Sequence, residues 1–180
     1  MTTMVTARLL TRDDLRALPD DGLRHELIDG QFVMTPAPGS NHQTISLTLA
    51  AMIRAQVLGS DLKVLTAPFD VALGPHVVEP DIVLARKADF TARDLPVAPL
   101  LVIEVLSPST SHLDQGRKRD LYAEAGVPHY WIVDPETPSI TTLTLTDGAY
   151  AQTAHVSRDE PLISHDPIAL NLSPAELLRD

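Results

Sequence analysis

Two carboxylates interrupt otherwise apolar stretches of this sequence. Asp81 directly precedes the apolar run Ile82–Leu84, and Glu104 lies inside the apolar run Leu100–Leu106. Placing a charge inside a buried strand costs several kcal/mol unless the charge is paired or binds a metal. Hard divalent cations prefer carboxylate oxygens, backbone carbonyls and water as ligands. If the two strands are neighbours, Asp81 and Glu104 can share one such ion, which would activate water and stabilise charge on a phosphoryl oxygen.

A lysine is the third candidate for the same site. Lys118 lies on the helix predicted after the Glu104 strand, where its ammonium group could orient a nucleophilic water or stabilise developing negative charge. A lysine in the middle of a helix is more often a solvated surface residue. Asp114, one helical turn earlier, is expected to pair with Lys118 and steer it. Glu26 is either a further acid of the site or a surface charge on a hairpin.

One segment of the chain positions both Glu104 and Lys118. The run Leu100–Leu106 is apolar on both faces, which is typical of a strand in the middle of a sheet. Side chains at helical spacing predict a helix over Ser111–Glu124. The aromatic and β-branched segment Pro128–Pro135 predicts another strand. The order strand, helix, strand indicates a right-handed crossover with two parallel strands.

The rest of the chain alternates strand and helix signals. Asp-Gly pairs predict two hairpins, at 24–34 and 140–153. Helices are predicted at 11–18, at 40–57 with Ser40 as its cap and Gln43 reaching back, and after Ser173. Further strands are predicted at 62–66, 69–73 and 77–84. The sequence therefore predicts an α/β fold with a mixed sheet, in a single domain of residues 1–180 with its core at about 20–155.

Composition excludes several classes of site and partner. The 180 residues include no cysteine, so disulfides, zinc–thiolate sites and cysteine nucleophiles are excluded. A net charge of −10 has the wrong sign for tight DNA binding through the whole surface, so any contact with nucleic acid must be local or short-lived. No signal peptide and no apolar run long enough to span a membrane is evident, so we expect a cytoplasmic protein.

The residues around Asp81 and Glu104 match a known pattern. Pro80-Asp81 followed by Glu104 resembles the PD-(D/E)XK nuclease superfamily. The matching segments are His25–Gly30, Pro36–Gly39 with His42, Pro80–Val83, Glu104–Thr110, Asp114, Lys118, Tyr122, Gly126-Val127 and Tyr130-Trp131. This dense set resembles one branch of the superfamily, the restriction endonuclease-like proteins long catalogued as a domain of unknown function.

The resemblance implies a restriction endonuclease-like αβββαβ core and hydrolysis of DNA. It also implies Mg²⁺, with Mn²⁺ as a possible substitute, bound by Asp81, Glu104 and the backbone carbonyl of Val105. Lys118 would act as an electrostatic helper, and Glu26 would be the outer acid of the site. A homodimer is the expectation for the branch. The first hypothesis is therefore a Mg²⁺-dependent endonuclease.

Three positions depart from the expected pattern. The lysine of the superfamily usually stands two residues after the glutamate, on the same strand face, where this chain has Leu106. In this branch the lysine has moved to the following helix, and Lys118 matches that position. Gln31 and His129 occupy places where the branch would have glutamates.

Other functions remain open. A retained nuclease fold that no longer cuts could serve as a dimeric binding or scaffold protein, and the acidic composition favours this alternative. The site could also hydrolyse RNA or a small phosphoester.

His42 either hydrogen-bonds at the start of its helix or contacts a phosphate there. Tyr122 and Trp131 are most simply core or interface residues. The remaining histidines show no ligand spacing and are interpreted as structural or exposed: His25, His76, His112, His155 and His165.

Overall fold

The computed structural model describes residues 8–19 and 21–179 of the chain. Its helices are α1 (Arg12–Arg16), α2 (Ser40–Val57), α3 (Ser111–Leu113) and α4 (Arg119–Glu124), with the π-helical turn η2 (Asp114–Lys118) joining α3 to α4. Two 3₁₀ helices complete this set, η1 (Lys87–Asp89) and η3 (Pro174–Leu178). Within the described residues, none of the helices has the length and apolar character needed to cross a lipid bilayer.

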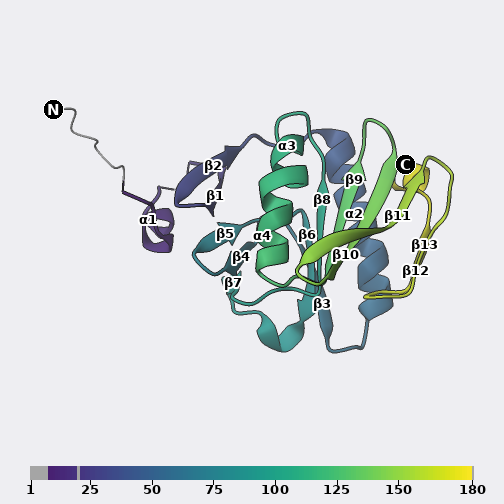
Figure 1. The fold of residues 1–180 in the computed structure, drawn as a ribbon. Coiled ribbons are helices and arrows are strands. Elements are labelled where there is room, and N and C mark those ends of the chain that lie inside the picture. Colours follow the sequence, from purple (N-terminus) through teal and green to yellow (C-terminus); the bar gives the residue numbers. More distant parts are fainter. Residues whose placement is uncertain (1–7, 20, 180) are drawn as a thin grey trace.

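The described strands form two main sheets and a separate hairpin. The large sheet has the order β11 (Ala149–Ser157), β10 (Ser139–Thr146), β9 (His129–Asp134), β8 (Leu101–Val105), β6 (Ile82–Arg86), β3 (Leu62–Thr66). The small sheet has the order β2 (Gln31–Thr35), β1 (Arg24–Ile28), β5 (His76–Val78), β4 (Asp70–Leu73), β7 (Asp94–Leu95), and the hairpin pairs β12 (Leu162–Ser164) with β13 (Leu170–Leu172). Helix α2 covers one face of the large sheet, α4 covers the other, and the small sheet lies beside α4 (Figure 1). The predicted α/β fold with a mixed sheet is confirmed.

The strands β8 and β9 lie in the middle of the large sheet. They pair in parallel, with Leu101 opposite His129 and Val105 opposite Val133, and the segment from α3 to α4 connects them. All five residues of β8 are buried, as expected for a strand that is covered on both faces. The predicted order of strand, helix and parallel strand is therefore confirmed.

Side chains of the central strands alternate between the two helices that cover the sheet. Ile103 and Trp131 pack in the apolar cluster of α2, whereas Val102 and Tyr130 pack in that of α4. Because successive strand residues point to opposite faces, Glu104 faces the same side as Val102. The large sheet therefore presents Glu104 to the helix that follows β8.

Both predicted hairpins form. In the first, Asp29 and Gly30 have φ values of 51° and 70°, and in the second Asp147 and Gly148 have φ values of 51° and 81°. Positive φ at both central residues is the requirement of the tight turns that join twisted antiparallel strands. The Asp-Gly pairs therefore identified both turns correctly.

The strand predicted over 77–84 is wrong as a single element. The chain leaves the small sheet after β5 and enters the large sheet at β6, and Glu79, Pro80 and Asp81 cross between them. Pro80 has no amide hydrogen to donate to a strand ladder, which explains why the pairing is broken there. Asp81 consequently stands at the junction of the two sheets.

The start of α2 also differs from the prediction. Gly39 is the N-cap and Ser40 is the first helical residue, so the predicted cap at Ser40 is wrong. The backbone amide of Gln43 donates to the Gly39 carbonyl instead. The buried face of the helix is apolar and is formed by Ile45, Leu49, Ala50, Ile53 and Val57.

The last part of the chain combines a capped helix with a hairpin that the sequence did not reveal. A helix does begin after Ser173, where Ser173 and Glu176 form a capping box, but this helix, η3, is a 3₁₀ rather than an α-helix. The short hairpin of β12 and β13 was not predicted, and its buried residues Leu162, Leu170 and Leu172 belong to the α2 cluster.

Candidate active site

Asp81 and Glu104 lie side by side at the end of two neighbouring strands. The strands β6 and β8 are antiparallel with Ile82 opposite Ile103, which brings Asp81 next to Glu104. The Asp81 amide donates to Oε2 of Glu104 over 3.4 Å. The two residues are 5% and 2% exposed. The structure therefore brings together the two acids that the sequence singled out.

Three groups hold the Asp81 carboxylate. The backbone amide of Val105 donates to Oδ2 over 2.8 Å, and Nε2 of His42 lies 3.1 Å from the same oxygen. Nη1 of Arg24 lies 3.4 Å from Oδ1. Burial alone would raise the pKa of Asp81, but the hydrogen bonds from His42 and Val105 and the charge of Arg24 outweigh it and lower the pKa. Asp81 is therefore held as a carboxylate.

Glu104 has a different set of partners. Nζ of Lys118 lies 3.1 Å from Oε1, and the hydroxyl of Tyr122 donates to the same oxygen over 2.7 Å. Burial raises the pKa of Glu104 well above its usual range; Lys118 opposes this, and the neighbouring carboxylates of Asp114 and Asp81 add to it. Glu104 therefore holds a proton more tightly than an exposed glutamate does.

Lys118 is buried, so its interpretation as a surface residue is wrong. Its side chain is 4% exposed, and Nζ lies 2.9 Å from Glu26, 3.1 Å from Glu104 and 3.6 Å from Asp114. The last contact is the predicted pair one turn apart on the helix. Burial alone would lower the pKa of Lys118, but the three carboxylates outweigh it and raise the pKa. The side chain is therefore an ammonium ion.

Glu26 belongs to the buried cluster, and its interpretation as a surface charge of the hairpin is wrong. The residue is 1% exposed, and its Oε1 accepts a hydrogen bond of 2.8 Å from the Glu79 amide. The same oxygen lies 2.9 Å from Nζ of Lys118. Lys118 therefore links an acid of the small sheet, Glu26, to an acid of the large sheet, Glu104.

Sequence reasoning missed two members of the cluster, Arg24 and Glu79. Nε of Arg24 lies 3.3 Å from Oε2 of Glu79, and its Nη2 donates to the Glu79 carbonyl. Burial raises the pKa of Glu79, although Arg24 opposes the rise. A signal for Arg24 was available, since Arg24 and Glu26 are two apart in a predicted strand and must share a face.

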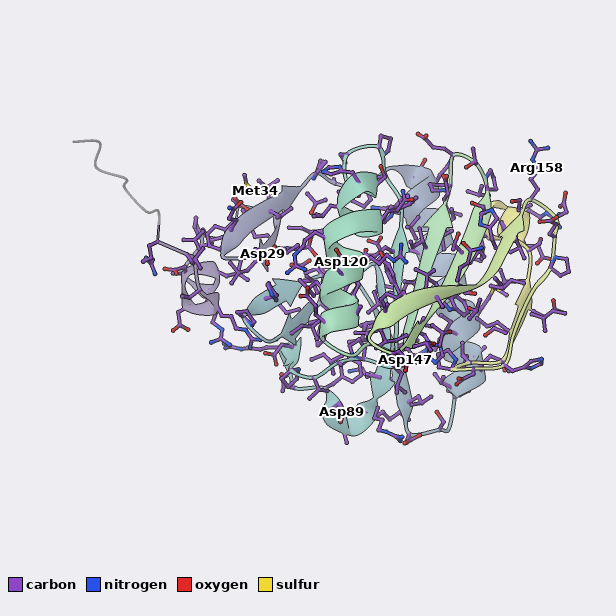
Figure 2. All side chains as sticks on the ribbon, viewed as in Figure 1. Asp29, Met34, Asp89, Asp120, Asp147 and Arg158 are labelled. Atoms are coloured by element: carbon purple, nitrogen blue, oxygen red, sulfur yellow. The ribbon has the colours of Figure 1, made fainter. Side chains whose placement is uncertain are left out.

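A cavity of about 180 Å³ opens onto this cluster. Asp81, Glu104 and Lys118 contribute to its lining, together with the loops at 36–39 and 107–110. Asp120, which Figure 2 labels on the covering helix, is solvent-exposed. The buried charges reach solvent through the cavity that these loops line.

Comparison with known proteins identifies the family of this chain. Residues 12–177 match the Uma2 family, which is described as putative restriction endonuclease. The protein belongs to the Uma2 family. The predicted relationship to restriction endonuclease-like proteins is confirmed, and it assigns the Uma2 chain to a family of nuclease type.

One sequence relative and one solved structure are similar to the Uma2 chain. It is 31% identical over 103 residues to an uncharacterized protein, slr1290, of Synechocystis sp.; this match covers 56% of the chain and 54% of the relative. The chain thus spans about half the length of this curated relative. The crystal structure of a putative nuclease of DUF820 from Anabaena variabilis superposes with a TM-score of 0.78 at 20% identity, covering 94% of this chain and 97% of the other. The second match establishes the shared fold.

Restriction endonuclease-like folds generally use divalent metals, and the donor set of this Uma2 protein fits such an ion. Its buried carboxylates are Glu26, Glu79, Asp81, Glu104 and Asp114. Among residues 8–19 and 21–179, the lysine and arginine side chains that pair with them are Arg24 and Lys118. The cluster therefore has an excess of negative charge and offers hard oxygen donors. Oε2 of Glu104 accepts a long hydrogen bond of 3.4 Å from the Asp81 amide, and Glu104 contributes to the lining of the cavity.

A divalent ion bound by these carboxylates would take most of its remaining ligands from water. Among residues 8–19 and 21–179, no three or more His, Asp or Glu side chains are arranged to hold a metal ion. Mg²⁺ usually keeps several waters and needs only one or two carboxylates. Val105 presents its amide to Asp81, and the role of its carbonyl as a ligand stays a prediction.

Proposed function

We propose that this Uma2 protein hydrolyses phosphodiester bonds of DNA with Mg²⁺, for which Mn²⁺ can substitute. Asp81, Glu104 and the carbonyl of Val105 would hold the ion. The observation that supports this most directly is the adjacent pair of Asp81 and Glu104, with the ammonium of Lys118 beside them, in a solvent-connected cavity.

The chemistry divides between the ion and the protein. When bound, the ion lowers the pKa of water and stabilises charge on a phosphoryl oxygen. The contacts from His42, Val105 and Arg24 keep Asp81 ionised and in place for binding. In the overall reaction a water oxygen bonds to phosphorus, the bond from phosphorus to the leaving oxygen breaks, and the leaving oxygen gains a proton.

Lys118 has two tasks in this proposal. Its contacts with Glu26 and Glu104 fix the position of Glu104. Its positive charge also compensates negative charge that develops on the phosphoryl oxygens in the transition state. Because the net charge of the chain is −10, contact with DNA would be local and transient.

Plasmid cleavage tests the proposal. We expect wild-type protein to nick or linearise plasmid DNA with Mg²⁺ or Mn²⁺ and to be inactive in EDTA. Asp81→Asn should reduce cleavage to background, and Lys118→Ala should reduce it about 10²–10³-fold, as removal of one stabilising donor does elsewhere. Arg117→Ala is the matched control, because it removes the adjacent but more exposed cation. Equal cleavage by wild type, Asp81→Asn and Lys118→Ala would reject the assignment.

A binding or scaffold protein, expected to be a homodimer, is the second candidate. It is favoured by the internal pairing of the acids, since His42, Arg24 and Lys118 already occupy oxygens of Asp81 and Glu104. Calorimetry separates the two candidates. Divalent-ion binding that is lost in Asp81→Asn supports the hydrolase, whereas no binding at millimolar ion supports the scaffold. Light scattering that gives a monomer at micromolar protein would contradict the homodimer.

A further inference from the structure

A second cavity of about 310 Å³ adjoins the candidate active site. It shares Arg24, Pro38, His42 and Asp81 with the smaller cavity above the acids. The two cavities are therefore adjacent, and a molecule bound in the larger one would lie beside the Asp81 side chain.

The walls of the second cavity are mostly apolar. Pro38, Leu47, Ala67 and Pro68 contribute to the lining, and they come from the loop before α2, from α2 and from the loop after β3. Leu47 is 71% exposed although it is a large apolar residue. The exposed part of this side chain does not belong to the core. It forms an apolar surface at the rim of the cavity.

Two polar side chains of α2 line the same cavity. The Ser46 hydroxyl donates to the His42 carbonyl over 2.9 Å, which leaves its oxygen able to accept a further hydrogen bond. The side-chain amide of Gln43 is exposed and makes no hydrogen bond within residues 8–19 and 21–179. An amide that can both donate and accept matches the edge of a nucleobase.

We propose that this second cavity binds an unpaired nucleobase next to the phosphate that is cleaved. The inference rests on the proposed hydrolysis of DNA and specifies its substrate class. The volume lies at the lower end of the range of about 300–1,000 Å³ for small-ligand pockets, which suits one flat base. The apolar walls would pack against its faces while Gln43 and Ser46 contact its edge.

The charge at the junction of the two cavities fits the same arrangement. Arg24 contributes to both linings, and its guanidinium, which contacts Asp81 and Glu79, places a positive charge where a phosphate would lie. A base can enter a recessed cavity only after it leaves the stack of a duplex. The expected substrate is therefore single-stranded or locally unpaired DNA.

Binding without cleavage tests the subsite independently of catalysis. The probe is a fluorescein-labelled single-stranded oligonucleotide, compared with its duplex by fluorescence anisotropy in EDTA at low ionic strength. We expect wild-type protein to bind the single strand about tenfold or more tightly than the duplex, the scale of one base–protein packing contact. Ser46→Phe, which fills the cavity, should abolish the preference. Ala55→Phe, at an exposed position further along α2, is the matched control and should keep it.

A second variant and a second probe guard against misfolding of Ser46→Phe. Gln43→Ala removes an exposed side chain without a partner and should reduce the preference about threefold or more, the cost of one neutral hydrogen bond. A series of single strands with one abasic site at successive positions should show one position at which binding drops. A flat abasic profile, or a wild-type preference retained in both variants, would overturn the proposal.

Cleavage assays separate this inference from the proposed function. If single-stranded and duplex DNA are bound and cut equally by wild type, the base subsite is rejected and the hydrolase stands. If no DNA is cut with Mg²⁺ or Mn²⁺ while the preference for the single strand and its loss in Ser46→Phe remain, the hydrolase is rejected and the base subsite stands.

Discussion

The two faces of the large sheet show how one set of strands can serve stability on one side and chemistry on the other. Towards α2 the buried cluster is formed by apolar side chains, among them Leu49, Ile103 and Trp131. Towards α4 a second apolar cluster lies beside the buried charges around Glu104 and Lys118. Glu104 stands between Ile103 and Val105, so strand alternation alone separates the two roles.

The difference has an energetic meaning. Apolar burial on the α2 face contributes about 25 cal/mol for each Å² removed from water. On the α4 face, the carboxylates of Glu26, Glu104 and Asp114 are costly to bury and depend on Lys118 for compensation. We therefore expect burial on the α2 face to stabilise the fold. The buried charges on the α4 face should cost stability, and they form the site.

Removal of Lys118 should produce the largest loss. Lys118→Met leaves three buried carboxylates without their cation, and breaking a buried pair in this way costs about 3–5 kcal/mol. Urea denaturation of the metal-free protein at neutral pH measures the change. Adding Glu104→Gln to Lys118→Met should recover part of the loss, because one uncompensated charge is removed. A loss below about 1 kcal/mol would contradict the compensation by Lys118.

A substitution that creates a cavity in the α2 cluster should reduce stability and leave activity unchanged. Leu49→Ala removes a fully buried side chain from the α2 cluster and should cost about 2–5 kcal/mol. Because Leu49 faces away from the acids, DNA cleavage per folded molecule should stay near that of wild type. Urea denaturation combined with plasmid cleavage measures both quantities. A specific activity that falls as far as in Lys118→Ala would show that the two faces are not independent.

The pH dependence of stability should reveal a titrating group on the α2 side. His129 is in phase with Trp131 on β9, and burial lowers its pKa below the usual 6.5, although Asp166 opposes the shift. The unfolded chain therefore binds a proton more readily than the folded protein, so stability falls as pH decreases below 6.5.

Thermal unfolding between pH 5 and 7 tests this prediction. His129→Asn should lose stability less steeply than wild type as the pH is lowered. His155→Asn, at an exposed position of β11, is the matched control and should follow wild type. Identical pH profiles for wild type and His129→Asn would contradict the assignment.

The smallest effect on stability is expected at Arg117, which is adjacent to Lys118 in the sequence. Arg117 precedes Lys118, but its ion pairs lie outside the core, with Asp29 at 2.6 Å and with Glu124 at 3.1 Å. The three side chains are 31%, 52% and 63% exposed. Figure 2 shows Asp29 beside the helix. Arg117→Ala should cost about 0–1 kcal/mol, because solvent screens such pairs. Thermal unfolding measures the change, and a loss as large as that of Lys118→Met would contradict the distinction between the exposed and buried cations.

Much of the fold was predictable because local signals and the final structure agree. The Asp-Gly turns, the apolar β8 strand and the helix that ends before Gly126 are encoded by neighbouring residues. The break at Pro80 was missed because the flanking residues 77–79 and 81–84 together look like one strand. Only the presence of two sheets, which no local pattern encodes, decides where each half pairs.

The site residues that could be predicted are charged residues in otherwise apolar segments of the sequence. Asp81 and Glu104 attracted attention because a charge is unexpected in an apolar strand. Arg24 and Glu79 did not, since they meet across a long sequence separation that no local pattern reveals. The burial of Lys118 depends on the small sheet packing beside the helix, which sequence alone did not indicate.

The π-helical turn from Asp114 to Lys118 has a consequence for how the site can change over evolution. Such a turn holds one more residue than an α-helical turn. Deleting one residue within it, such as Gly116, would return the segment to ordinary α-helical turns. Asp114 and Lys118 would then stand three positions apart and still share one face of the helix. A single codon could thus be lost from this gene segment without turning Asp114 away from the lysine.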